Sequence, residues 1–63
     1  NMYRAPASYV AERRNPSTGA IYFVPVSSDR GQSWGTRHAD RAAAEVAILE
    51  SGGRVIAGPE EKK

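Results

Sequence analysis

The stretch "AIYFVPV", Ala20 to Val26, decides the fold because it reads as a strand that does not alternate. A strand with one solvent-exposed face alternates apolar and polar residues, since neighbouring side chains point to opposite faces. Here both faces are apolar, one with Ile21, Phe23 and Pro25 and the other with Tyr22, Val24 and Val26. Such a strand needs cover on two sides, and a chain of 63 residues has little material for the second cover.

The residues before this strand predict a β-hairpin. In "NPSTG", residues 15–19, Asn15 starts a turn, Pro16 presets φ at the next position, and Gly19 accepts a positive φ at the exit. A loop of this kind between two strand-like runs is typical of a hairpin. We therefore expect strands over residues 8–14 and 20–27. Pro25 donates no ladder hydrogen bond, which favours an edge or a bulge there.

The residues after the hairpin predict one helix and one short strand. Thr36 or Asp40 can cap the helix, because both side chains accept hydrogen bonds from early backbone N–H groups. We expect the helix over about residues 37–51, ended by Gly52 in the left-handed conformation. Its expected apolar stripe consists of Ala39, Ala42, Ala43, Val46 and Leu49 or Glu50. A last strand over residues 54–57 follows.

This order predicts an α+β fold, a two-layer ββαβ domain with a small antiparallel sheet against one helix. We expect one domain over residues 8–58, with a loose lead over residues 1–7 and a disordered tail over residues 59–63. Asn1 resembles the remnant of a cloning site, so we expect Met2 to be the native start.

The hairpin register assigns the two faces of the sheet. If residues 16–19 form the loop, Asn15 lies opposite Ala20, and the following pairs are Arg13 with Tyr22, Ala11 with Val24 and Tyr9 with Val26. We expect the helix on the face of these pairs, because small apolar side chains let an Ala-rich helix approach the sheet closely. That face holds Tyr9, Ala11, Tyr22, Val24 and Val26.

The opposite face is then uncovered, and we expect it to be the partner-binding site. It carries Ile21 and Phe23, ringed by Glu12 and Arg14. A small monomer seldom exposes a contiguous apolar patch without use. Three interpretations stay open: a homodimer interface, a site for a different protein, or a patch closed by Trp34 and Tyr3 of the same chain.

The composition argues against an enzyme. There is no Cys, and His38 is the single His, so no thiolate site and no metal-ligand spacing exists. Ser33, His38 and Asp40 do not read as a catalytic triad, since helical side chains two residues apart do not face each other. No phosphate-binding or dinucleotide glycine motif is present. We expect no enzymatic activity and no cofactor or metal.

One set of cations predicts an anion or nucleic-acid contact. Arg37, His38 and Arg41 lie where the helix begins, and its free N–H groups favour an anion there. Arg13 could add to this contact from the hairpin. The alternative is that Asp40 neutralises the helix start.

The expected function is a small protein-binding module in the cytoplasm that self-associates or captures another protein. No apolar run is long enough to cross a bilayer, so no membrane partner is expected. Short, Cys-free, Ala- and Arg-rich chains of this style look like accessory or inhibitor proteins of phages, which would place this one in a host bacterial cytoplasm.

A DNA-binding domain is the alternative. The run from Tyr9 to Leu49 resembles the arm-type, AP2-like sheet-plus-helix domains at the N-termini of phage-type integrases. Those domains share the order of basic strand, polar Gly turn, strand, aromatic residue and Thr-capped Ala-rich helix. The resemblance implies that Arg13 and Arg14 would contact phosphates and enter a groove. Residues 20–26 carry no base where that family's strands are basic, and the last strand has no counterpart.

Overall fold

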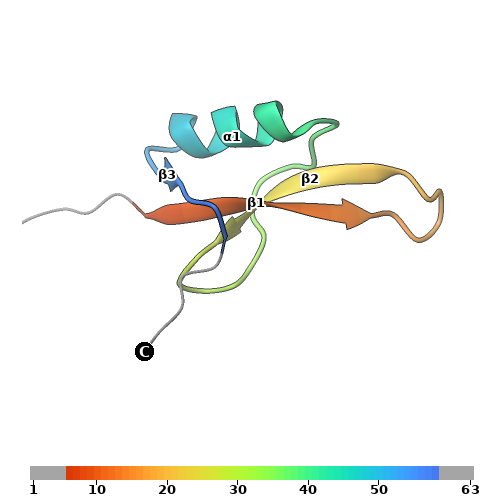
Figure 1. Cartoon of the computed structure of the whole chain (residues 1–63), viewed down its shortest axis with the longest axis horizontal. Coiled ribbons are helices and arrows are strands. Elements are labelled where there is room, and N and C mark those ends of the chain that lie inside the picture. The colour runs from red at the N-terminus through yellow and green to blue at the C-terminus, as the bar shows by residue number, and fades with distance from the viewer. Residues whose placement is uncertain (1–5, 59–63) are drawn as a thin grey trace, which may run out of the picture.

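The structure is a computed structural model that describes residues 6–58, so the expectations for residues 1–5 and 59–63 lie outside it. Its elements are β1 (Ala7–Arg14), β2 (Ile21–Ser27), α1 (Arg41–Glu50) and β3 (Arg54–Val55). The sheet order is β2-β1-β3, and α1 packs on one face (Figure 1). The predicted α+β class is confirmed. The sheet is mixed rather than wholly antiparallel, because β3 pairs in parallel with β1.

The hairpin forms as the turn sequence predicts. The Asn15 side-chain oxygen accepts a hydrogen bond from the Ser17 amide at 2.9 Å, and Gly19 has a φ of 77°. Tyr9 lies opposite Val26, Ala11 opposite Val24 and Arg13 opposite Tyr22. The predicted register is therefore confirmed, because local turn chemistry sets it.

The helix is shorter than predicted at its N-terminus. Asp40 caps it by accepting a hydrogen bond from the Ala43 amide at 2.9 Å. The residues before the cap stay extended because they pair with β2: the amide of His38 donates to the Phe23 carbonyl and the amide of Phe23 to the His38 carbonyl, both at 2.8 Å. The helix ends where predicted, with Gly52 at a φ of 89°.

Residues 32–38 run along the outer edge of β2. The Ser27 amide donates to the Gln32 carbonyl at 2.9 Å, and the Trp34 amide donates to the Pro25 carbonyl at 3.0 Å. These bonds, with the His38 pair, show that odd-numbered residues of β2 direct their backbone groups at this segment. The missing N–H of Pro25 therefore costs no hydrogen bond to β1. This segment runs antiparallel to β2, so it brings the chain to the turn end of the hairpin. The helix α1 then runs in the opposite direction, and β3 follows it beside the start of β1.

The helix covers the opposite face of the sheet from the one that the sequence analysis predicts. The core cluster under α1 consists of Val10, Ala44 and Ile48, with Phe23, Trp34 and Val55 packed against it. The helix thus lies on the face expected to be open, and the expectation that it covers Tyr9, Ala11, Tyr22, Val24 and Val26 is wrong. The reason is that Trp34 and Val55, distant in sequence, complete a core around Val10 that the hairpin alone does not reveal.

The helix stripe is corrected as well. Its buried residues are Ala44 and Ile48, whereas Val46 and Leu49 are 50% and 59% exposed. Both stripes satisfy helical spacing, so periodicity alone does not choose between them.

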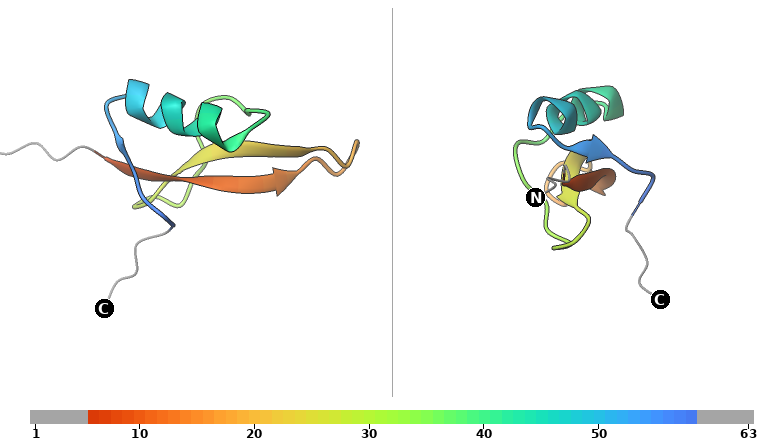
Figure 2. Two further views of the ribbon diagram at one scale, coloured as in Figure 1. Left: turned by 45° about the horizontal axis from the view of Figure 1, so that its top comes forward. Right: turned by 90° about the vertical axis from the view of Figure 1, so that its left-hand side faces the viewer.

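The face away from α1 is also covered by the chain. Val24 and Val26 are only 7% and 1% exposed. The loop after β2 and the residues after β3 pass on this side of the sheet, opposite the helix, in both views that show the layers (Figures 1 and 2). The doubly apolar strand is therefore buried on both sides at its Pro25–Val26 end without a partner chain.

Candidate functional site

The outer edge of β1 is open along most of its length. The Asn15 amide donates to the Ala20 carbonyl at 2.8 Å, so odd-numbered residues of β1 direct their backbone groups at β2. Even-numbered residues face the other way. At the start of the strand the carbonyls of Pro6 and Ser8 accept from the amides of Arg54 and Ile56, each at 2.9 Å.

The strand β3 covers only the start of that edge, because it has two residues. After it the chain turns away from β1 (Figure 1). The backbone groups of Val10, Glu12 and Arg14 consequently have no strand beside them within residues 6–58. We call these three residues the open edge.

The open edge belongs to a hairpin that projects from the rest of the domain. Its distal half extends beyond α1 (Figures 1 and 2), and residues 12–14 are exposed. Nothing in the described chain lies between this half of β1 and solvent on the edge side. An extended segment therefore has access to it.

Cations lie on both faces of the hairpin that carries the open edge. On the face away from α1, the Arg37 guanidinium lies 4.5 Å from the centre of the Tyr22 ring, and Arg13 is the cross-strand partner of Tyr22. On the face of α1, the Arg41 guanidinium lies 5.4 Å from the centre of the Phe23 ring. Guanidinium stacking holds these cations over the sheet while leaving their N–H groups available.

The predicted partner site is only partly formed. Glu12 lies opposite Phe23 and Arg14 opposite Ile21, so the four residues do share one face. Phe23, however, packs against the core beneath α1 and under Arg41. Ile21, at the projecting end, is 42% exposed. The expectation of an uncovered apolar face is therefore wrong, because the helix occupies it.

The predicted anion site at the helix start is not assembled. Arg37 and Arg41 lie on opposite faces of the sheet, since they cover the neighbouring residues Tyr22 and Phe23. The Nε2 atom of His38 is buried and has no hydrogen-bond partner. Of the four predicted residues, the structure brings together Arg13 and Arg37, on either side of Tyr22.

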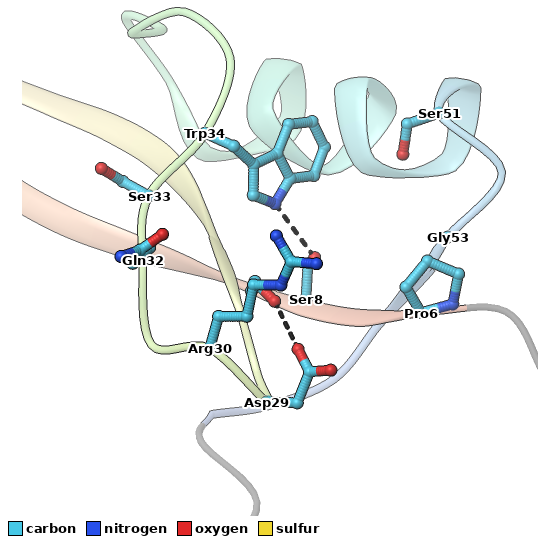
Figure 3. Close-up of a pocket in the computed structure, with 10 residues that line it drawn as sticks. Pro6, Ser8, Asp29, Arg30, Gln32, Ser33, Trp34, Ser51 and Gly53 are labelled. Atoms are coloured by element: carbon cyan, nitrogen blue, oxygen red, sulfur yellow. Dashed lines mark hydrogen bonds between the residues drawn. The ribbon is translucent and has the colours of Figure 1, made fainter.

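A cavity of about 360 Å³ lies at the other end of the sheet (Figure 3). The indole N–H of Trp34 donates to the Ser8 hydroxyl at 3.3 Å and fixes one wall. The Ser27 hydroxyl donates to Asp29 at 2.7 Å and holds the pKa of that carboxyl below its ordinary value. The lining residues are Pro6, Ser8, Ser27, Asp29, Arg30, Gln32, Ser33, Trp34, Ser51 and Gly53.

The sequence pattern predicted no site at this cavity. Trp34 was expected only as one alternative cover for the sheet face of Phe23, and it does pack with Phe23 against the core. An isolated Trp between two glycines was the available signal. The cavity is polar around one aromatic wall, and its Asp29 carboxylate is already engaged by Ser27.

The described residues hold no group of three or more His, Asp or Glu side chains placed to share a metal ion. Across the same range, α1 is the one helix, and it is neither long nor apolar enough to span a bilayer.

The open edge of β1, with arginines on both sides, is the best-defined candidate site. Comparison with protein-family models, curated proteins and solved structures finds no match to this chain.

Proposed function

We propose that this domain is a non-enzymatic protein-binding module that adds an extended segment of its partner to the outer edge of β1. The observation that carries the proposal is the open edge itself: three residues of a projecting strand whose backbone groups lack a neighbouring strand. Strand addition uses such groups for affinity and the flanking side chains for specificity.

The local sequence supports this use. Natural proteins protect exposed edges with proline, bulges or a covering segment. The other edge of the hairpin is covered from Phe23 to Ser27 by residues 32–38. Residues 10–14 of β1, by contrast, contain neither proline nor glycine and pair with β2 without a bulge. Their charged side chains discourage indiscriminate pairing and favour a strand of matching charge.

The test is Glu12→Pro. The amide of Glu12 points outward, so proline removes one donor of the open edge and places its ring in the path of an incoming strand, while no hydrogen bond to β2 is lost. Glu12→Ala is the matched control, because it removes the same side chain and keeps the amide.

Peptides selected from a random display library on the immobilised domain provide the ligands. We expect Glu12→Pro to weaken their binding by about tenfold or more, since each backbone hydrogen bond contributes roughly 1 kcal/mol and the ring adds a steric clash. Glu12→Ala should retain most of the affinity. Equal binding by the two variants, both folded by circular dichroism, contradicts strand addition.

Amide hydrogen exchange tests the premise independently. The amides of Val10, Glu12 and Arg14 should exchange rapidly in the free domain and become protected with a selected peptide. The amides of Phe23 and Ser27, which donate to residues 38 and 32, should be protected throughout.

Nucleic-acid binding is the second candidate, favoured by the placement of Arg13 and Arg37 on either side of Tyr22. A two-stranded β-ribbon fits the major groove of B-DNA. With a double-stranded oligonucleotide, log affinity should then fall with log salt by about 0.9 per phosphate contact, and Glu12→Pro should leave the affinity unchanged. Loss of binding in Glu12→Pro, or no salt dependence, excludes this function.

A further inference from the structure

We infer that the segment received by the open edge is an acidic strand of another protein, running antiparallel to β1. The inference rests on the proposed function. It follows from the side chains that an incoming strand would meet on each face, together with the length of edge that β3 leaves free.

Both faces of the hairpin that carries the open edge bear arginines. Arg14 lies on the face of α1, where Arg41 stacks on Phe23. Arg13 lies on the opposite face, where Arg37 stacks on Tyr22. Glu12 is the one acidic residue of the exposed part of β1. Asp40, at the helix start, is engaged as the helix cap.

In self-pairing through this edge, each antiparallel register leaves at least one like-charge pair or a clash with β3. Outward-facing residues must lie opposite each other, so even-numbered residues pair with even-numbered ones. One register places Glu12 opposite Glu12 of the second copy. The next places Arg13 opposite Arg13, although it also sets each Glu12 opposite Arg14 of the other copy. The one beyond it places Arg14 opposite Arg14. Like charges directly opposite each other destabilise a strand pair.

A register shifted toward the start of β1 is blocked by β3. It would place Val10 opposite Glu12 of the second copy and would carry the second copy's Arg14 to a position opposite Ser8. The outward carbonyl of Ser8 already accepts the Ile56 amide at 2.9 Å. The second strand and β3 would therefore occupy the same place.

A strand with two adjacent acids avoids all of these conflicts. Adjacent residues of a strand point to opposite faces, so one acid would lie opposite Arg14 and the next opposite Arg13. The following residue, opposite Glu12, should be neutral, and the one after it, opposite Ala11, should be small and apolar. Each cross-strand pair of opposite charges strengthens binding by up to about fivefold.

The test uses three capped peptides that differ at two positions: acetyl-TEETVT-amide, acetyl-TQQTVT-amide and acetyl-TKKTVT-amide. Each is titrated at low salt into the ¹⁵N-labelled domain, following the amides of Val10, Glu12 and Arg14. We expect the acidic peptide to bind about tenfold more tightly than the neutral one, from two charge pairs. The basic peptide should be the weakest.

Charge reversal adds a matched pair of variants. Arg14→Glu should move the preference toward the basic peptide. Arg30→Glu makes the same change in net charge at the cavity, beyond the open edge, and should leave the order of the three peptides unchanged. An identical effect of both variants would show that net charge alone sets the preference and would overturn the inference.

The remaining outcomes separate the inference from the proposed function. If the neutral or basic peptide binds as well as the acidic one, and Glu12→Pro abolishes that binding, the acidic preference is wrong and strand addition stands. If no peptide perturbs the open-edge amides at millimolar concentration, both are wrong. A dimer in analytical ultracentrifugation that Glu12→Pro dissociates would show that a second copy is the occupant.

Discussion

The two outer edges of the hairpin differ in how much of each is covered by another backbone segment. The edge of β2 is closed from Phe23 to Ser27 by residues 32–38, through four backbone hydrogen bonds of 2.8 to 3.0 Å. The edge of β1 is closed only beside residues 7 and 8, where the two-residue β3 pairs with it. The difference follows from the topology: the connection to α1 retraces β2, whereas β3 pairs with β1 only at Ala7 and Ser8.

Trp34→Ala breaks the closed edge and should have the largest effect on stability. The indole packs against the core cluster and holds residues 32–38 against β2. We expect a loss of about 3 kcal/mol or more, comparable with the whole net stability of so small a domain. Urea denaturation followed by circular dichroism measures it.

Trp34→Phe is the matched control for that change. It keeps an aromatic ring in the core and removes the N–H donor that Ser8 accepts at 3.3 Å, so the loss should be nearer to about 1 kcal/mol. An unchanged denaturation midpoint in Trp34→Ala would show that backbone pairing alone closes the β2 edge.

Gly53→Ala tests the short closed part of the β1 edge. A Cβ at this position would lie 2.9 Å from the Pro6 carbonyl oxygen, a backbone atom that accepts the Arg54 amide. Either β3 or the start of β1 must shift, at a cost of about 1–3 kcal/mol. Gly58→Ala, where a Cβ meets nothing within 4 Å, should be close to neutral. Equal thermal midpoints for the two variants would contradict this close approach.

Ser27→Ala should have the smallest effect, and that effect should depend on pH. The Ser27 hydroxyl donates to Asp29 in the turn that starts the closed edge and lowers the pKa of that carboxyl. A lowered folded pKa adds stability above the ordinary value of about 3.9, and this stability is lost as pH falls through the folded pKa.

NMR titration of the Asp29 carboxyl checks that effect. In Ser27→Ala the pKa of Asp29 should rise toward its ordinary value. The stability difference between the variant and the parent protein should then be present at neutral pH and shrink in acid. An Asp29 pKa unchanged by the substitution would show that the backbone and Arg30 lower it instead.

The sequence predicted only part of the candidate site. Arg13 and Arg37 were both predicted to contact an anion, and the structure brings them together around Tyr22. Pro25 was expected to mark an edge or a bulge, and β2 is indeed an outer strand of the sheet, with residues 32–38 paired along its other side. Proline reports only that its own amide is not needed, and it does not tell which segment runs past it.

The sequence by itself determined the local features: the Asn15–Gly19 turn, the strand register, the Asp40 cap and the end of the helix at Gly52. Each depends on the chemistry of a few neighbouring residues. Only the tertiary structure decided which sheet face α1 covers, which helix stripe is buried and which strand edge stays open. These depend on Trp34, residues 32–38 and β3, which meet the hairpin across long stretches of chain. Both sheet faces and both helix stripes were apolar enough to pack, so pattern alone did not distinguish them.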